Sequence, residues 1–196
     1  VAVGSREIHV RVAIPGIHIA RNALAVAAAL DAVGVDLDEA LPALATLPPP
    51  PGRGTRTELA VNGGRILLID ESYNANPASM RAALAVLGTV PRASFGRRLA
   101  VLGDMLELGE QEKTHHVALK EAVDAAGTDL VFACGPNMAH LFAALAPEKQ
   151  GAWTPSSDQL GERLFAELRP GDVVMIKGSN GSRMGPLADA LRTRLS

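Results

Sequence analysis

Three clusters of residues that could bind a charged ligand occur in this chain, each directly after a short apolar run. They contain, in order, Asp70 with Asn74 and Asn76, then Asp104, then Lys177 with Ser179 and Arg183. Lysine and arginine attract anions, and glycines beside them let a backbone approach an anion closely. The residue types therefore indicate a site for a polar, anionic ligand, with Lys177 and Arg183 as its positive partners.

The apolar runs before these clusters predict short buried strands. Residues 66–69 form one such run. Asn76 and Pro77 then predict the start of a helix, because asparagine is a strong N-cap and proline is tolerated at the first helical position. The polar turn between them thus lies at the carboxyl end of a strand and the amino end of a helix, where ligands bind in open α/β sheets.

The same residues also fit less specific interpretations. One such loop is more often only a solvated turn, but a parallel sheet brings the ends of three strands to one edge. A metal site is not expected, because Asp104, Glu107 and Glu110 lie beside glycines, where charged side chains are usually solvated. The adjacent histidines 115 and 116 point about 100° apart on a helix and cannot share one ion. Neither a Walker phosphate loop nor a Gly-x-Gly-x-x-Gly sequence occurs, so the chain lacks the standard means of holding a triphosphate or a dinucleotide.

Strand and helix patterns alternate after residue 54, which predicts an α/β fold with a mostly parallel, Rossmann-like sheet and helices on both faces. The predicted strands are 56–61, 65–70, 99–102, 129–133, 151–154 and 172–176, and the first two form a hairpin through residues 62–64. The predicted helices are 77–87, 111–126, 137–146, 157–168 and 184–195. Nearer the N-terminus, a strand over 5–14 and helices over 16–33 and 36–44 are expected.

The strongest candidate domain boundary is a run of four prolines, residues 48–51, followed by Gly52 and Gly54. A proline run favours an extended polyproline II spacer, and glycines allow a bend. We expect a hinge here, with one domain over residues 1–50 and a second over residues 51–196.

Overall composition limits the class of protein. A net charge of −2 offers no basic surface for nucleic acid, and no apolar run approaches the roughly 20 residues that span a bilayer. The single cysteine, Cys134, follows an apolar run, which predicts an inert buried thiol in a reducing compartment. No signal peptide is visible, and the first residue is Val1 rather than methionine. We therefore expect a cytoplasmic location and a fragment of a longer protein.

Five segments, in order along nearly the whole chain, resemble the Mur ligase family. They are residues 16–24, 51–54, 70–77, 101–109 and 177–179. The octapeptide from Asp70 to Pro77, together with the loop from Leu102 to Met105, is similar to the branch that adds D-alanyl-D-alanine. The resemblance implies that residues 1–50 are the C-terminal part of the family's central, ATP-binding domain. Residues 51–196 would then be its C-terminal domain.

The resemblance also implies a reaction. ATP phosphorylates the carboxylate of UDP-MurNAc-tripeptide to an acyl phosphate, and D-alanyl-D-alanine displaces phosphate to form an amide in a peptidoglycan precursor. ATP would be the cofactor, with Mg²⁺ held mainly by the part of the central domain that this chain lacks. A chain without the Walker loop is expected to be inactive by itself. The family is bacterial and cytoplasmic, and a monomer without nucleic-acid or membrane partners is expected.

Site residues are implied in the same way, by matching this sequence to the family's segments. Arg53, facing the nucleotide phosphates, and Lys177 are the catalytic candidates. Asn22 would face the adenine and Asp70 the ribose or a nearby phosphate. The remaining candidates for nucleotide or substrate binding are Tyr73, Asn74, Asn76, Asp104, His116, Ser179 and Arg183. No residue is expected to bind a metal.

Two other functions remain open from the sequence. One is a sister Mur-type amide ligase of the amino-acid-adding or folylpolyglutamate type. The other is an α/β module that binds an anionic small molecule without catalysis.

Overall fold

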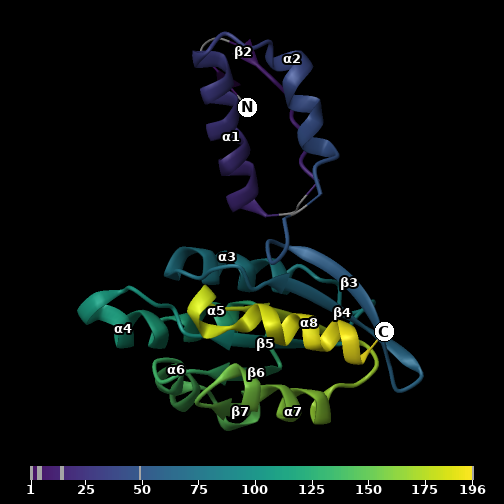
Figure 1. Ribbon diagram of the computed structural model, residues 1–196, viewed down its shortest axis with the longest axis vertical. Helices are drawn as coiled ribbons and strands as arrows, with labels where there is room; N and C mark the ends of the chain where they lie inside the picture. The colour runs from purple at the N-terminus through teal and green to yellow at the C-terminus, as the bar shows by residue number, and fades with distance from the viewer. Residues whose placement is uncertain (1, 4–5, 14–15, 49, 196) are drawn as a thin grey trace. The chain divides into compact units, whose positions relative to one another are not determined.

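The computed structural model describes residues 2–3, 6–13, 16–48 and 50–195. The chain divides into two compact units, Val1–Pro50 and Pro51–Ser196 (Figure 1).

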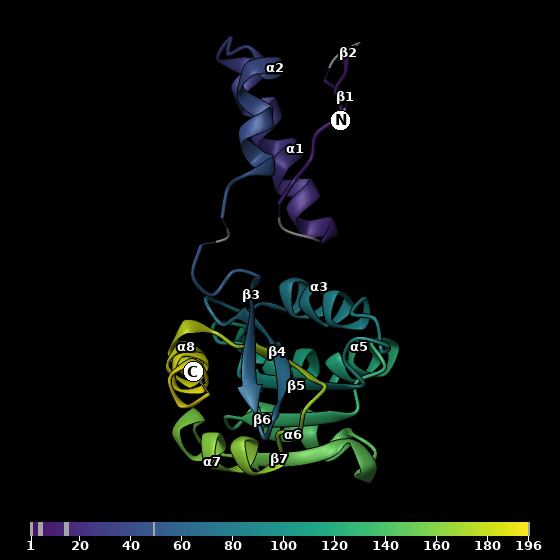
Figure 2. The same cartoon turned by 90° about the vertical axis from the view of Figure 1, so that its right-hand side faces the viewer.

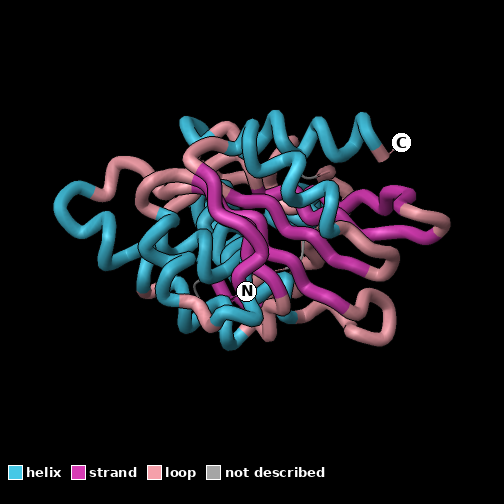
Figure 3. The backbone as a smooth tube through the Cα atoms, turned by 90° about the horizontal axis from the view of Figure 1, so that it is seen from below, coloured by secondary structure: helices cyan, strands magenta, loops and turns pink. Residues whose placement is uncertain are grey.

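The second unit contains a six-stranded sheet with the strand order β3-β4-β8-β5-β6-β7. Figure 3 shows its strands in magenta, with helices in cyan beside them. The strands are β3 (Thr55–Val61), β4 (Gly64–Glu71), β5 (Arg97–Gly103), β6 (Leu130–Cys134), β7 (Gln150–Thr154) and β8 (Asp172–Lys177). Only β3 runs antiparallel to its neighbour, as the first arm of the predicted hairpin with β4. The prediction of a mostly parallel α/β sheet is confirmed.

Helices cover both faces of this sheet. They are α3 (Pro77–Gly88), α4 (Glu112–Val117), α5 (Leu119–Ala125), α6 (Met138–Ala144), α7 (Ser157–Glu167) and α8 (Met184–Arg194). Residues of α3, α5 and α6 pack on one face, and residues of α7 and α8 pack on the other (Figure 2). Because β4, β5 and β8 are covered on both faces, their sequences are nearly continuous apolar runs rather than alternating ones.

The N-terminus of α3 shows how the sequence determines the first polar turn. The Asn76 side chain accepts a hydrogen bond from the Ser79 N–H at 2.8 Å, and the Ser79 hydroxyl accepts one from the Asn76 N–H at 3.0 Å. This capping box, with Pro77 at the first helical position, ends the turn after β4 at a defined residue.

Three predicted elements differ from the structure. The helix expected over 36–44 is the short α2 (Leu37–Ala40) followed by a 3-10 helix over Leu41–Ala45. The single helix expected over 111–126 is two helices, α4 and α5, that meet at Ala118. Of the strand expected over 5–14, residues 5 and 14 lie outside the described residues, and only Arg6–Glu7 (β2) is a strand. A strand needs a hydrogen-bonding neighbour, and in the described part of the first unit β2 has only the two-residue β1 (Ala2–Val3).

The first unit otherwise consists of α1 (Ile17–Ala32), α2 (Leu37–Ala40) and a 3-10 helix over Leu41–Ala45. Its described core cluster consists of Ile8, Ala27, Leu37 and Leu41, and Ala23 is also buried. Several apolar side chains of this unit are exposed, namely Ile17, Leu24, Val26, Val33, Val35 and Leu47. Within the described residues of the chain, no helix is long and apolar enough to cross a membrane.

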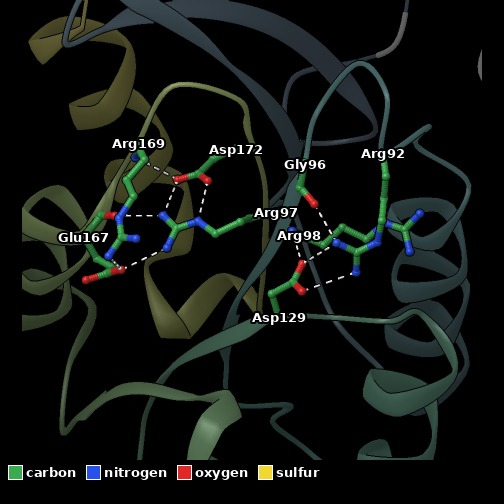
Figure 4. Close-up of polar contacts among 8 residues, drawn as sticks. All are labelled: Arg92, Gly96, Arg97, Arg98, Asp129, Glu167, Arg169 and Asp172. Atoms are coloured by element: carbon green, nitrogen blue, oxygen red, sulfur yellow. Dashed lines mark hydrogen bonds and ion pairs between the residues drawn. The ribbon is translucent and has the colours of Figure 1, made fainter.

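Ion pairs between arginines and aspartates connect the amino ends of β5, β6 and β8 (Figure 4). Arg97 donates two hydrogen bonds to the carboxylate of Asp172, at 2.8 and 2.9 Å, and a third to Glu167 at 3.0 Å. Arg92 likewise donates two hydrogen bonds to the carboxylate of Asp129. The acidic partners raise the pKa of the Arg97 guanidinium. These contacts lie at the end of the sheet opposite the predicted site, and they stabilise the strand register.

Candidate functional site

The three polar loops predicted from the sequence meet at the carboxyl edge of the sheet. The backbone register pairs Glu71 of β4 with Lys177 of β8, and Lys177 with Leu102 of β5. Strands β4 and β5 therefore flank β8. Asp70 lies near the carboxyl end of β4, and Asp104 directly follows β5. The structure brings the three loops together at one edge, as the sequence predicts.

Ser179 connects all three loops. Its N–H donates to the Asp104 carbonyl at 3.0 Å, and its hydroxyl donates to the Ala75 carbonyl at 3.3 Å. The same hydroxyl accepts a hydrogen bond from the Leu106 N–H at 2.9 Å. Ser179 is buried, so it holds the site together rather than presenting a group to solvent.

Asp104 is also buried, and it organises the loop after β6. Its carboxylate accepts hydrogen bonds from the N–H groups of Asn137, at 3.2 Å, and Met138, at 2.7 Å. Only glycine fits at position 135, because φ is +105° there and a Cβ atom would lie 2.4 Å from the Asp104 carboxyl carbon. The loop from Gly135 to Asn137 is thereby held against the loop after β5.

His116 is fully buried, and its hydrogen bond to Met105 holds the loop after β5 in place. Its Nε2 atom accepts a hydrogen bond from the Met105 N–H at 3.0 Å, and its Nδ1 atom lies 2.7 Å from the Glu112 carbonyl. Since the carbonyl can only accept, Nδ1 is the donor in this contact. His116 thus has both ring nitrogens committed to backbone groups.

Lys177 is buried beneath the loop after β4. Its Nζ donates to the Asn74 carbonyl at 2.8 Å and to the Glu71 carbonyl at 3.4 Å. Burial lowers the pKa of this ammonium, the Glu71 carboxylate at 3.9 Å opposes that shift, and the charge of Arg53 adds to it. Lys177 therefore orders the loop and brings a partly compensated positive charge close to it.

Asp70 lies on the sheet face that α7 and α8 cover. Its carboxylate accepts hydrogen bonds from the Ser72 N–H at 3.0 Å and from the Arg192 guanidinium of α8 at 2.5 Å. The carboxylate is buried, and these contacts compensate its charge. They also define the turn that carries Tyr73.

The predicted site residues that remain exposed are Arg53, Tyr73, Asn74, Asn76 and Arg183. The Arg53 guanidinium lies over the Tyr73 ring, 4.1 Å from its centroid. Asn22, the predicted adenine contact, is exposed on α1 of the first unit. The structure does not place it relative to the loops of the second unit.

A pocket of about 370 Å³ opens at this edge, between the loops after β5, β6, β7 and β8. Its lining includes Asp104 and Arg183, together with segments that the sequence analysis did not select: Gly135–Asn137 and residues 155–158. Each segment follows a strand and contains Gly, Pro or Ser, and the second continues into the first turn of α7; this composition after a strand is the signal that could have identified them. A larger hollow of about 650 Å³ beside β7 contains none of the predicted site residues.

Cys134 also borders this pocket, but its thiol is not reactive. The side chain is buried, and burial together with the negative charges of Asp104 and Asp158 raises its pKa to about 12. The thiol stays protonated at neutral pH, as expected for an inert packing residue. Among the described residues, no group of three or more His, Cys, Asp or Glu side chains could hold a metal ion.

Comparisons with known proteins agree with this fold. The family model described as "Mur ligase, glutamate ligase domain" matches residues 55–180. UDP-N-acetylmuramoyl-tripeptide–D-alanyl-D-alanine ligase of Escherichia coli (strain K12) is 37% identical over 95% of this chain and 39% of that protein. The ligase of the same name from Mycobacterium tuberculosis (strain CDC 1551 / Oshkosh) is 34% identical over 94% of this chain and 40% of that protein.

Solved structures of Mur ligases also have the fold of this chain. A crystal structure of MurF from Acinetobacter baumannii matches with a TM-score of 0.76 and 26% identity, over 94% of this chain and 39% of that one. A MurF ligase from Thermotoga maritima in complex with ADP has the same fold, with a TM-score of 0.73 and 24% identity over 93% of this chain and 39% of that one. The chain spans about two fifths of the length of these relatives. Since the family model matches more than half of it, the chain belongs to the Mur ligase family.

Proposed function

We propose that this chain is the C-terminal part of an ATP-dependent ligase that adds D-alanyl-D-alanine to UDP-MurNAc-tripeptide in peptidoglycan synthesis. The relatives with 34–37% identity carry that name. The observation on which the proposal rests is the carboxyl-edge pocket, because its charged groups suit a small zwitterionic peptide.

The charges around this pocket are of opposite sign. Arg183 and Asp158 both line it and are both exposed, and no side-chain hydrogen bond or ion pair involves either of them within the described residues. A dipeptide carries one carboxylate and one amino group, so Arg183 can bind the carboxylate while Asp158 attracts the amino end. A pocket of about 370 Å³ is at the small end of the range for ligand sites, which suits a dipeptide better than a nucleotide.

Arg53 is the group best placed for the nucleotide side of the reaction. Its guanidinium is exposed, and the described residues provide no carboxylate or carbonyl partner for it. A phosphate oxygen would fill that role. Lys177, the second catalytic candidate, contributes by ordering the neighbouring loop and by its charge.

We assign residues 1–50 to the end of the central, ATP-binding domain. The first unit buries few apolar side chains and exposes several, with Ile17 at 67% and Val33 at 75%. A surface of this kind fits a segment that packs against more protein. ATP and Mg²⁺ would be bound mainly by that further part, since the sequence has no Walker loop and its described residues offer no metal cluster.

This division of the site has a chemical reason. An acyl phosphate hydrolyses readily, so the amine must reach it with water excluded. Two domains that close on each other can supply both the positioning and the exclusion. The chain alone is therefore expected to have no turnover.

The test is ADP release by the complete protein encoded by the gene. With ATP, Mg²⁺ and UDP-MurNAc-tripeptide present, we expect release with D-alanyl-D-alanine, and at least tenfold less with glutamate or diaminopimelate. The 196-residue chain alone is the matched control and is expected to release none. Release with another amino acid would assign a sister ligase, and no release by the complete protein would favour a non-catalytic binding module.

A further inference from the structure

The backbone of Arg53 is fixed to the turn after β4. The Gly52 carbonyl accepts a hydrogen bond from the Tyr73 N–H at 3.1 Å, and the Gly54 N–H donates to the Asp70 carbonyl at 2.8 Å. Gly52 has φ of +69°, and a Cβ atom there would lie 2.8 Å from the Tyr73 nitrogen. Arg53 is therefore part of the second unit rather than of a flexible joint.

Within the described part of the chain, the Arg53 side chain makes one ring contact and no hydrogen bond or ion pair. Its guanidinium carbon lies 4.1 Å from the centroid of the Tyr73 ring. Stacking of this kind occupies the face of the guanidinium and leaves its N–H groups, which lie in the plane, free to donate. Tyr73 is 54% exposed, so its ring is not required for the core.

A second arginine in the same unit shows what a structural stacked pair looks like. Arg194 lies over the Phe165 ring at 4.3 Å, but it also donates a hydrogen bond to Glu162 at 2.9 Å. Its donors are thus partly occupied by the protein itself. The Arg53 donors have no such partner among the described residues.

We propose that Tyr73 is a positioning residue, which holds the Arg53 guanidinium in one orientation with its N–H groups directed outward to bind an anionic phosphate oxygen. Taking that oxygen as one of the nucleotide or acyl phosphate rests on the proposed function. The ring acts by stacking, so the phenol hydroxyl is not needed. Tyr73 acts through Arg53 and does not itself contact the anion.

The test uses NMR of the 196-residue chain and inorganic pyrophosphate as the probe. The Tyr73 ring current should shift the Arg53 side-chain protons, and this shift should be lost in Tyr73→Leu and kept in Tyr73→Phe. Pyrophosphate affinity should fall about two- to fivefold in Tyr73→Leu and stay unchanged in Tyr73→Phe. Arg194 next to Phe165 is the internal control, and its shifts should not move.

A double variant separates positioning from direct contact. In the background of Arg53→Gln, adding Tyr73→Leu should weaken pyrophosphate binding no further. Further weakening, a defect in Tyr73→Phe equal to that in Tyr73→Leu, or no pyrophosphate binding by the parent chain would each overturn the proposal. Because these measurements need no turnover, their failure is distinguishable from failure of the ligase assay.

Discussion

Replacing Arg183 with glycine is expected to impair use of D-alanyl-D-alanine without destabilising the fold. Arg183 has φ of +55°, which disfavours any residue with a side chain by roughly 1–2 kcal/mol. Glycine removes that strain, although it costs about 0.5–1 kcal/mol in added freedom of the unfolded chain. The free energy of unfolding should therefore stay the same or rise by up to about 1.5 kcal/mol.

The expected loss of binding is large. A hydrogen bond to a charged group contributes about 1.5–3 kcal/mol, which corresponds to an increase of roughly 10- to 100-fold in KM for the dipeptide. The measurement is steady-state kinetics of the complete protein with Arg183→Gly and Arg183→Gln. Unfolding of the chain in urea, followed by the fluorescence of its single tryptophan, Trp153, gives the stability.

Arg163 provides a matched control for this prediction. It is an exposed arginine of α7 that lines the hollow beside β7 instead of the carboxyl-edge pocket. Arg163→Gln should leave KM for the dipeptide unchanged. If Arg183→Gln raises KM no more than Arg163→Gln does, the carboxylate of the dipeptide does not bind at Arg183.

At the opposite edge of the sheet, a substitution should lower the stability of the fold and leave dipeptide binding unchanged. Replacing Arg97 with leucine is expected to lower the free energy of unfolding by about 3 kcal/mol, because it leaves the carboxylate of Asp172, which is 1% exposed, without its two-bond partner. The Arg169 N–H, at 2.8 Å, remains as a donor and limits the loss. Urea unfolding monitored at Trp153 measures the change.

One further variant and one further measurement identify the cause of that loss. Asp172→Asn added to Arg97→Leu should recover part of the stability, since a neutral amide replaces the unpaired charge. The folded fraction of Arg97→Leu in the complete protein should keep its KM for the dipeptide. A destabilisation below about 1 kcal/mol would show that the pair contributes no more than a surface ion pair.

The sequence predicted the sheet and its helices because local signals agreed with the tertiary fold. The runs before Asp70, Asp104 and Lys177 are apolar enough to be buried on both faces, and Asn76-Pro77 starts α3 where expected. The break at Ala118 escaped prediction because no glycine or proline marks it. Periodicity alone does not distinguish one helix from two short ones in sequence.

For the site, the sequence predicted the loops after β5 and β8 but not the segments after β6 and β7, and it did not predict which atoms face outward. Asp104, His116 and Lys177 look like ligand-binding groups by type, whereas the structure directs their polar atoms at backbone groups of neighbouring loops. That direction depends on partners far along the chain. Gly52 and Gly54 were likewise expected to form a flexible joint, but their hydrogen bonds to Tyr73 and Asp70 attach them to the second unit.

Hydrogen exchange of the complete protein, with and without ADP and D-alanyl-D-alanine, tests whether the carboxyl-edge loops form the ligand site. We predict slower exchange over residues 104–108, 135–137, 156–158 and 178–183 when both ligands are present. The hairpin turn at 62–64 and strand β7 should not change. Slower exchange confined to β7 or the hairpin, or no change in the four loops, would contradict the account.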